Sequence, residues 1–186
     1  MAIDDLIQDA SRRMHKSVEA AQAEFATLRT GRASTGLLDR VQIDYYGQKT
    51  PLKQLATVNS PEPRLITIQP FDPNSVSAIE RAIQESDLGL TPSNDGKLIR
   101  LPIPQLTEER RKELVKIVRQ LAEDGRIAVR NVRRDVMHHL KELVDKGEVG
   151  SDEEHRAEER VQKLTDEHTH TIDELLTKKE AEILEV

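Results

Sequence analysis

The length of the helical pattern in the C-terminal half of the sequence constrains the fold more than any other feature. Apolar residues recur at three- and four-residue spacings from about residue 107 to 145 and again from 151 to 183. Gly147 and Gly150 mark a short turn between the two segments. At 1.5 Å per residue each helix would be roughly 50 to 60 Å long, and neither can bury its apolar stripe alone. The sequence therefore predicts a long helical hairpin that needs a further partner.

The N-terminal segment supplies that partner. Residues 3–29 carry a stripe of the same kind, and Gly31 is a natural stop for a helix. The stripe consists of Ile3, Leu6, Ile7, Ala10, Met14, Val18, Ala21, Phe25 and Leu28. We therefore expect a long three-helix bundle.

The sequence also predicts where the two C-terminal helices begin. Thr107 is expected to cap the first of them, followed by Glu108 and Glu109 at the positive end of the helix dipole. Ser151 and Glu154 have the spacing of a capping box, which predicts the start of the last helix.

Between these helices the hydrophobic period changes from three or four residues to two. Strands are expected around Val41–Tyr45 and over residues 55–58, 64–69 and 97–103, and Asp72 with Pro73 predicts the start of one helix. The predicted fold class is thus α+β: a bundle of residues 1–30 and 105–186 with a small α/β domain, 31–104, inserted into it. The two adjacent linkers form a potential hinge, to which we assign Thr30, Gly31, Arg32, Pro102 and Pro104.

The composition excludes several classes of site. The 186-residue chain has no cysteine, which rules out a disulfide, a thiolate metal site and a cysteine nucleophile. No apolar run approaches the roughly 20 residues of a membrane-spanning helix, and the N-terminus does not resemble a signal peptide. We therefore expect a cytoplasmic protein with no membrane partner. Aromatic residues make up only 2% of the chain, which argues against binding by base stacking.

Charge is distributed unevenly along the chain. The formal net charge is −6, yet residues 110–134 carry 9 basic and 3 acidic groups. On a helical wheel with Leu114 at zero and about 100° per residue, the residues within roughly 40° of zero form the expected core face. They are Leu114, Val118, Leu121, Ala128, Val132, Val136 and Leu143. Between about 100° and 160° lies a group that we call the basic strip: Lys112, Arg119, Arg126, Arg130 and Arg133. Lys116 and Arg134 flank it.

Three interpretations of the basic strip remain open on these residues. A solvated face would normally mix both signs of charge, whereas Arg126 and Arg130, four residues apart, repel each other and only Glu123 interrupts the strip. Pairing with acidic residues of the last helix, such as Glu153, Glu158 or Glu159, would contribute little to stability at the surface. A phosphate backbone would give salt-sensitive binding to such a strip.

Spacing argues against other chemistries. The histidine pairs His138–His139 and His168–His170 do not follow the i, i+4 spacing of zinc-binding helices, so no metal site is expected. The cluster "SDEEH" (151–155) stands at a predicted helix start, where acidic residues are common. No phosphate-binding glycine loop occurs, so any GTP must be used by a partner, and no cofactor is expected.

Five sequence blocks resemble the bacterial ribosome recycling factor family, in order and over essentially the whole chain. They are "LRTGRAS" (28–34), "SDLGL" (86–90), "LTEERRKELVKIV" (106–118), "AVRNVRRD" (128–135) and "VQKLTD" (161–166). The resemblance implies a three-helix bundle and a smaller α/β domain in an L shape similar to tRNA. Gly125 departs from it, since family members often carry alanine there, and so does "VMHHL" (136–140). Gly125 predicts either a close helix approach or a bend in the helix.

The resemblance also implies a function. Such a protein binds the post-termination ribosome, chiefly through large-subunit rRNA, and with elongation factor G and GTP separates the subunits. It makes no bond itself, binds no DNA and acts as a monomer. Arg130 and Arg133 match the family's rRNA-contacting arginines, whereas Arg29, Arg110, Lys116 and Arg119 lie in matching blocks. The alternative from the residues alone is a helical RNA-binding scaffold or RNA chaperone without a GTPase partner.

Overall fold

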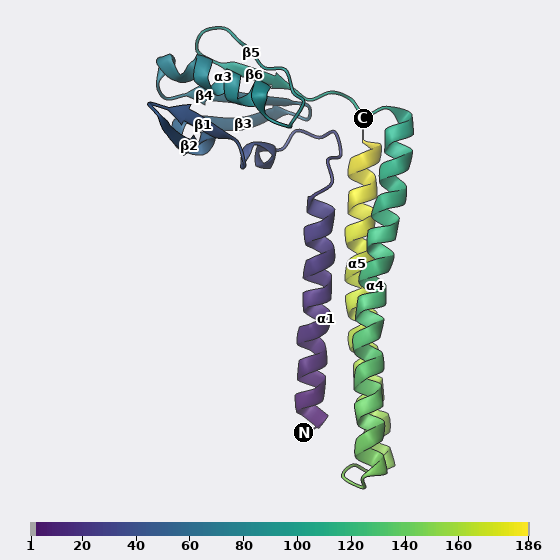
Figure 1. Cartoon of the computed structure of the whole chain (residues 1–186). Coiled ribbons are helices and arrows are strands. Elements are labelled where there is room, and N and C mark those ends of the chain that lie inside the picture. Colours follow the sequence, from purple (N-terminus) through teal and green to yellow (C-terminus); the bar gives the residue numbers. More distant parts are fainter. Residues whose placement is uncertain (1–2, 186) are drawn as a thin grey trace. The chain divides into compact units, whose positions relative to one another are not determined.

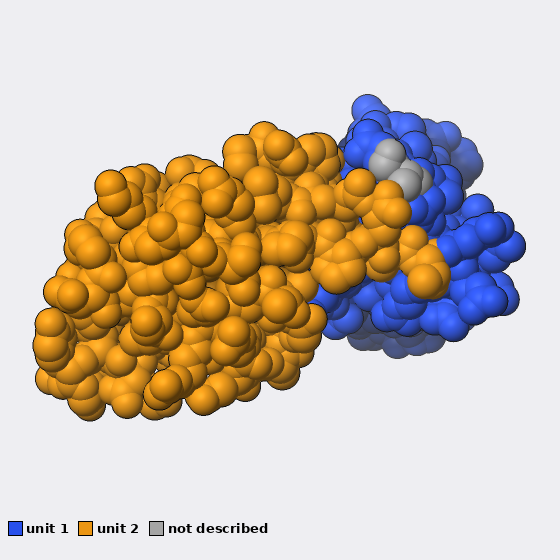
Figure 2. Space-filling view, turned by 90° about the horizontal axis from the view of Figure 1, so that it is seen from above, with its two compact units in different colours: residues 1–30, 108–186 blue, residues 31–107 orange. Residues whose placement is uncertain are grey.

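The computed structural model describes residues 3–185, which divide into two compact units. One unit comprises the described residues up to Thr30 together with those from Glu108 onward, and the other comprises Gly31–Thr107 (Figure 2). The second unit is therefore an insertion between two parts of the first. This arrangement, a long helical bundle with an inserted α/β unit, confirms the predicted fold class.

The first unit is built from three long helices, α1 (Ile3–Ala26), α4 (Glu108–Asp145) and α5 (Ser151–Leu184), which lie side by side (Figure 1). α4 runs antiparallel to the other two, so the start of α1 lies at the same end as the turn between α4 and α5. Seven members of the predicted α1 stripe are buried, whereas its end members Ile3 and Leu28 are half-buried. Each helix thus buries its apolar stripe against the other two, as the long patterns required.

The turn between α4 and α5 differs from the predicted capping box. Gly147 has a φ of +73° and closes α4 in a Schellman motif: its N–H donates to the Val144 carbonyl, and the Glu148 N–H donates to the Leu143 carbonyl. α5 is capped by the backbone of Gly150, which accepts from the Glu154 N–H at 3.0 Å without a side-chain capping bond. The prediction that Ser151 caps this helix was therefore wrong, because Ser151 is already its first helical residue.

The core face of α4 is displaced from the predicted one. Leu121, Ala128 and Leu143 are only half-buried, whereas Ala122 and Val129 are fully buried. On the same wheel the buried residues extend from 0° at Leu114 to about 80° at Ala122 and Leu140, so Leu114 lies at the edge of the buried face. The true buried face is therefore centred about 40° nearer to the basic strip. It consists of Leu114, Val118, Ala122, Gly125, Val129, Val132, Val136 and Leu140.

The inserted unit contains two antiparallel sheets. A hairpin joins β1 (Gln42–Tyr45) to β2 (Gln48–Pro51). The larger sheet has the order β3-β4-β6-β5, with β3 at Ala56–Glu62, β4 at Leu65–Pro70, β5 at Ser93–Asn94 and β6 at Ile99–Pro102. The remaining elements are the short helix α2 (Leu52–Leu55), the longer helix α3 (Val76–Glu85) and the 3-10 turns η1 (Thr35–Leu38) and η2 (Pro73–Ser75).

Alternating residues of these strands and one face of α3 form the core of the inserted unit. Ile66, Ile68, Ile99 and Leu101 on β4 and β6 have no exposed surface, and Ile79 of α3 is buried with them. The predicted start of the helix at Asp72 is confirmed as a capped 3-10 turn, because the Asp72 side chain accepts from the Asn74 N–H at 2.9 Å. The sheet and α3 thus form one apolar core separate from that of the bundle.

The chain enters and leaves the inserted unit along neighbouring paths. The Ala33 N–H donates to the Pro63 carbonyl at 2.6 Å, and the Ile103 N–H donates to the Arg64 carbonyl at 2.8 Å. Gly31 has a φ of +76°, and a Cβ there would lie 2.8 Å from Leu106 Cγ, so only glycine fits. Of the other residues assigned to the hinge, Thr30 is buried, Arg32 and Pro104 are exposed, and Pro102 ends β6.

Candidate nucleic-acid interface

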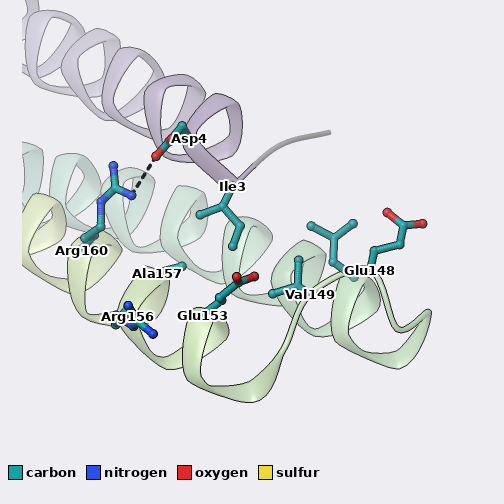
Figure 3. A pocket seen from close by; sticks show the side chains of 9 residues that line it. Ile3, Asp4, Glu148, Val149, Glu153, Arg156, Ala157 and Arg160 are labelled. Carbon is teal, nitrogen blue, oxygen red and sulfur yellow. Dashed lines mark hydrogen bonds and ion pairs between the residues drawn. The ribbon is translucent and has the colours of Figure 1, made fainter.

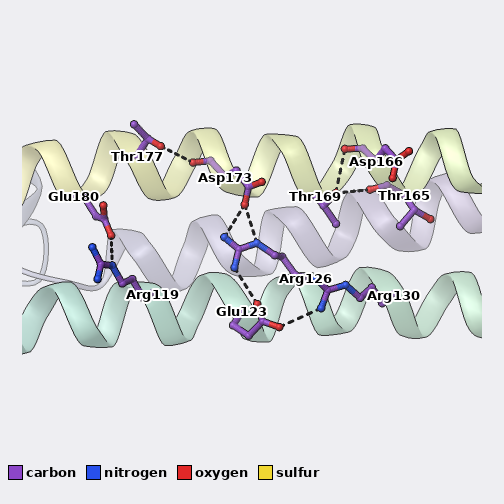
Figure 4. Close-up of polar contacts among 10 residues, drawn as sticks. All are labelled: Arg119, Glu123, Arg126, Arg130, Thr165, Asp166, Thr169, Asp173, Thr177 and Glu180. Carbon is purple, nitrogen blue, oxygen red and sulfur yellow. Dashed lines mark hydrogen bonds and ion pairs between the residues drawn. The ribbon is translucent and has the colours of Figure 1, made fainter.

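The basic strip lies on α4 along the side that faces α5, and Figure 4 shows its central part. Because the buried face of α4 is displaced toward the strip, Arg126 and Arg133 border the core and are half-buried, whereas Arg130 and Arg119 are exposed. The strip is therefore the boundary between the α4–α5 contact and solvent, and its members differ in how firmly they are held.

Arg126 is the most firmly held arginine of the strip, with only 20% of its side chain exposed. Its Nε donates to Asp173 Oδ1 of α5 at 2.7 Å, and its Nη2 lies 2.6 Å from the same oxygen. Its Nη1 donates to Glu123 Oε2 at 3.0 Å. Burial alone would lower the pKa of Arg126, but the hydrogen bonds to Asp173 and Glu123 outweigh it, so this pKa is raised. Arg126 therefore ties α4 to α5.

Arg119 makes a second tie to α5, because its Nε donates to Glu180 Oε1 at 2.7 Å (Figure 4). The numbers of the two partners add to 299 both for this pair and for Arg126 with Asp173, as expected for an antiparallel hairpin that turns near residue 149. Pairing of the strip with acidic residues of the last helix thus occurs, but the partners named from the sequence were wrong. Glu153, Glu158 and Glu159 lie in the first turns of α5, opposite the far end of α4.

Arg130 and Arg133 have no carboxylate partner on α5 among the described residues. Arg130 Nη1 donates to Glu123 Oε1 at 3.1 Å, and 45% of the Arg130 side chain is exposed. Arg133 Nη1 donates to the neutral amide oxygen of Gln162 at 3.1 Å. These two arginines retain most of their N–H donors for an external acceptor.

The remaining predicted residues of the site are all exposed or half-buried at the surface. Lys112 pairs with Glu108 at 3.0 Å, and Arg110 pairs with Glu113 at 3.0 Å. Lys116 has no ion-pair partner within residues 3–185. Arg29 follows the end of α1, and Arg134, beside the strip, donates to Asn131 one turn earlier. The structure therefore brings Lys112, Lys116, Arg119, Arg126, Arg130 and Arg133 onto one helix, with Arg29 on a different segment.

Glu123 links the two central arginines of the strip. Its two carboxylate oxygens accept separately from Arg126 and Arg130, and these hydrogen bonds lower the pKa of Glu123. From the sequence alone, Glu123 is expected only as an interruption of the strip, and neither Asp173 nor Gln162 is an expected partner. The spacing of three and seven residues from Glu123 to the arginines places all three on one face of the helix, which is the signal that could have found this contact.

Other kinds of site find less support in the structure. No group of three or more histidine or acidic side chains in residues 3–185 is placed to hold a metal ion. No helix in the described part of the chain is long and apolar enough to cross a membrane. An open pocket of about 440 Å³ lies at the end of the bundle beside the α4–α5 turn (Figure 3). Its wall mixes both signs of charge, and Arg160 there pairs with Asp4 at 2.9 Å, so it does not favour an anion.

Comparison with known proteins places the chain in a family. A family model described as ribosome recycling factor matches residues 21–184. The ribosome-recycling factor of Rubrobacter xylanophilus is 57% identical over 180 residues, which cover 97% of each chain. That of Halalkalibacterium halodurans is 54% identical over 182 residues, which cover 98% of each chain.

Solved structures agree with this assignment. A solution structure of the ribosome recycling factor matches with a TM-score of 0.76 and 45% identity, covering 100% of this chain and 99% of that one. A model of the Thermus thermophilus ribosome recycling factor, presented with Escherichia coli elongation factor G bound to the post-termination complex, matches with a TM-score of 0.66. Its identity is 48%, over the whole of both chains. The chain therefore belongs to the ribosome recycling factor family.

Proposed function

We propose that this protein is a non-enzymatic translation factor of the cytoplasm. It binds the post-termination ribosome and, together with elongation factor G and GTP, splits it into subunits for a new round of translation. Membership of the family supports this function, and so does the likeness to a factor presented with elongation factor G on the post-termination complex. GTP hydrolysis is assigned to elongation factor G, because the sequence has no phosphate-binding glycine loop.

The proposal rests on the polar contacts of Arg130 and Arg133. Both lie on a rigid 38-residue helix, and neither is neutralised by a carboxylate of α5 in the described chain. Two guanidinium groups about one turn apart on a rigid support can each donate to a phosphate oxygen of an RNA backbone. We assign to them the main contacts with large-subunit rRNA. Lys112, Lys116 and Arg119 extend this surface along α4, and Arg110, Arg126 and Arg29 complete the proposed set.

We also propose a division of roles between the two parts of the chain. The bundle, residues 1–30 and 105–186, would bind rRNA. The inserted domain, residues 31–104, has eight basic and eight acidic residues and hence no net charge, which suits a protein partner better than a phosphate backbone. Elongation factor G is the partner that we assign to it, with Thr30, Gly31, Arg32, Pro102 and Pro104 acting as the hinge.

The test of the rRNA surface is the double variant Arg130→Glu with Arg133→Glu. It should sediment with ribosomes much more weakly than the parent at ~50 to 200 mM salt, because two attractive charges become repulsive. The matched control is Lys163→Glu with Lys178→Glu, which makes the same change of charge at exposed positions of α5. If the arginine variant keeps its helical content and binds as tightly as this control, the strip is not the anchor.

Subunit splitting measured with and without elongation factor G tests the rest of the function. The proposal expects splitting by the parent protein only when elongation factor G and GTP are present. A scaffold or RNA chaperone would act equally well without them, so splitting that does not depend on the GTPase would support the alternative.

A further inference from the structure

Glu123 is the only carboxylate within ion-pair distance of Arg130 in the described chain. Arg130 is one of the two arginines to which the proposed function assigns the main rRNA contacts. The structure thus places a negative charge directly beside the group that is expected to meet a phosphate. An RNA phosphate and Glu123 would compete for the same guanidinium.

A second hydrogen bond, from Arg126, fixes the Glu123 carboxylate beside Arg130. Its Oε2 accepts from Arg126, which is itself fixed to Asp173 of α5 through two of its nitrogens (Figure 4). The carboxylate therefore cannot follow Arg130 outward without giving up a second hydrogen bond. When Arg130 turns toward a phosphate, Glu123 stays behind with Arg126, and its charge remains close to the bound RNA.

We propose that Glu123 is a built-in counter-ion that competes with rRNA phosphate for Arg130 and thereby limits the affinity of the factor for the ribosome. This inference rests on the proposed function, in which Arg130 binds phosphate. It also gives Arg126 a distinct role as a positioning residue, because Arg126 holds Glu123 in place. A factor that must leave the ribosome after each round needs a limited affinity, and this arrangement lowers it without removing an arginine.

Asp124 provides a matched control for this inference. It is the next residue of α4, it carries the same charge, and its Oδ1 accepts from Gln120 at 2.9 Å. It pairs with no arginine among the described residues. Glu123→Gln and Asp124→Asn therefore remove the same charge from the same turn of the helix, but only the first frees Arg130.

The experiment measures binding of each variant to purified large ribosomal subunits from ~50 to 300 mM potassium chloride. We expect Glu123→Gln to bind about three- to five-fold more tightly than Asp124→Asn near 100 mM, with the difference shrinking as salt rises. The slope of log K against log salt should steepen by up to about one, because Arg130 then counts fully as a phosphate contact. In an Arg130→Ala background, Glu123→Gln should give no gain over Asp124→Asn.

Two results would overturn the inference. Equal binding by Glu123→Gln and Asp124→Asn would mean that the charge acts only at long range. Weaker binding by a Glu123→Gln protein of unchanged helical content would mean that Glu123 orients Arg130 for RNA instead of competing with it. Failure of the proposed function is recognised separately, because then Arg130→Glu with Arg133→Glu would bind like its own α5 control.

Discussion

Gly125 of α4 lies so close to Ala21 of α1 that a Cβ atom on Gly125 would be 3.1 Å from the Ala21 Cβ. Ile172 of α5 closes the third side, with its Cδ1 3.2 Å from the same position. α4 continues without interruption from Glu108 to Asp145. Of the two expectations for this glycine, a close approach of the helices or a bend in α4, the close approach is therefore correct.

Substitution of Gly125 should depend steeply on side-chain size. Gly125→Ala gains roughly 1 kcal/mol of helix propensity, which the tight contact with Ala21 partly offsets, so we expect a net change below about 1 kcal/mol. Gly125→Val adds two further methyl groups between three helices and should destabilise the bundle by about 2 kcal/mol. Urea unfolding followed by helical circular dichroism measures both values. A valine variant as stable as the alanine variant would contradict the tight packing.

Arg126 should matter more to stability than its neighbours on the strip. Arg126→Ala removes hydrogen bonds to Asp173 and Glu123 and leaves Asp173 without its partner, so we expect a loss of about 1 to 2 kcal/mol in the free energy of unfolding. Arg134→Ala is the control, because exposed Arg134 donates, among the described residues, only to Asn131 of its own helix. Its effect should stay within about 0.5 kcal/mol. Equal losses in the two variants would show that the tie to α5 is not stabilising.

The fold was predictable because its signals are long and repetitive. The stripe of α1 and the 38-residue pattern of α4 could not be buried without each other, and the change of period after Gly31 marked the inserted unit. The error in the core face of α4 arose from the choice of reference residue, because Leu114 lies at the edge of the buried face and not at its centre. A face centred on Leu114 placed Leu121 and Ala128 in the core, whereas the bundle buries Ala122 and Val129, which lie on the other side of Leu114 on the wheel.

The long helical pattern also made part of the site predictable. The helical period places the arginines of α4 on one flank, but it does not identify their partners on another helix. Asp173 and Glu180 become opposite to Arg126 and Arg119 only once the register of the α4–α5 hairpin is fixed. Counting outward along both helices from the turn near residue 149 favours these residues over Glu153, Glu158 and Glu159. The spacing of Glu123 to Arg126 and Arg130 places the three residues on one face of α4, but which carboxylate oxygen accepts from which arginine depends on rotamers, which a residue pattern does not specify.

The ion pair between α1 and α4 should make stability depend on acidic pH. Arg13 Nη2 donates to Asp135 Oδ2 at 2.7 Å, and this hydrogen bond lowers the pKa of Asp135 below its ordinary value. A depressed carboxyl pKa in the folded state stabilises the protein at pH above about 4, and this contribution is lost as the pH falls through the folded-state value. The unfolding free energy of Asp135→Asn should therefore fall less than that of the parent on acidification from ~pH 5 to ~pH 2.

Asp145→Asn serves as the control for Asp135, because Asp145 is exposed at the end of α4 and pairs with no base among residues 3–185. Its unfolding free energy should keep the pH dependence of the parent. If the curves of Asp135→Asn and Asp145→Asn coincide, the pair with Arg13 does not persist in solution.

The β1–β2 hairpin should respond in opposite directions to changes at its two turn residues. Tyr46 has a φ of +49° and Gly47 a φ of +80°, as in a type I′ turn, in which asparagine followed by glycine is favoured. Tyr46 is 82% exposed and touches Tyr45 edge-on with a ring separation of 4.5 Å, so little apolar burial compensates its backbone conformation. Tyr46→Asn should therefore stabilise the inserted unit by about 0.5 to 1 kcal/mol.

Gly47→Ala provides the opposite case within the same turn. A Cβ on Gly47 would meet no atom within 4 Å, so no collision contributes and the cost is that of the left-handed backbone alone. We expect a loss of about 1 kcal/mol. Hydrogen exchange of the β1 and β2 amides reports the local effect, and thermal unfolding of the whole chain reports the global one. A Tyr46→Asn protein that loses protection in this hairpin would mean that the contact with Tyr45 outweighs the strain at Tyr46.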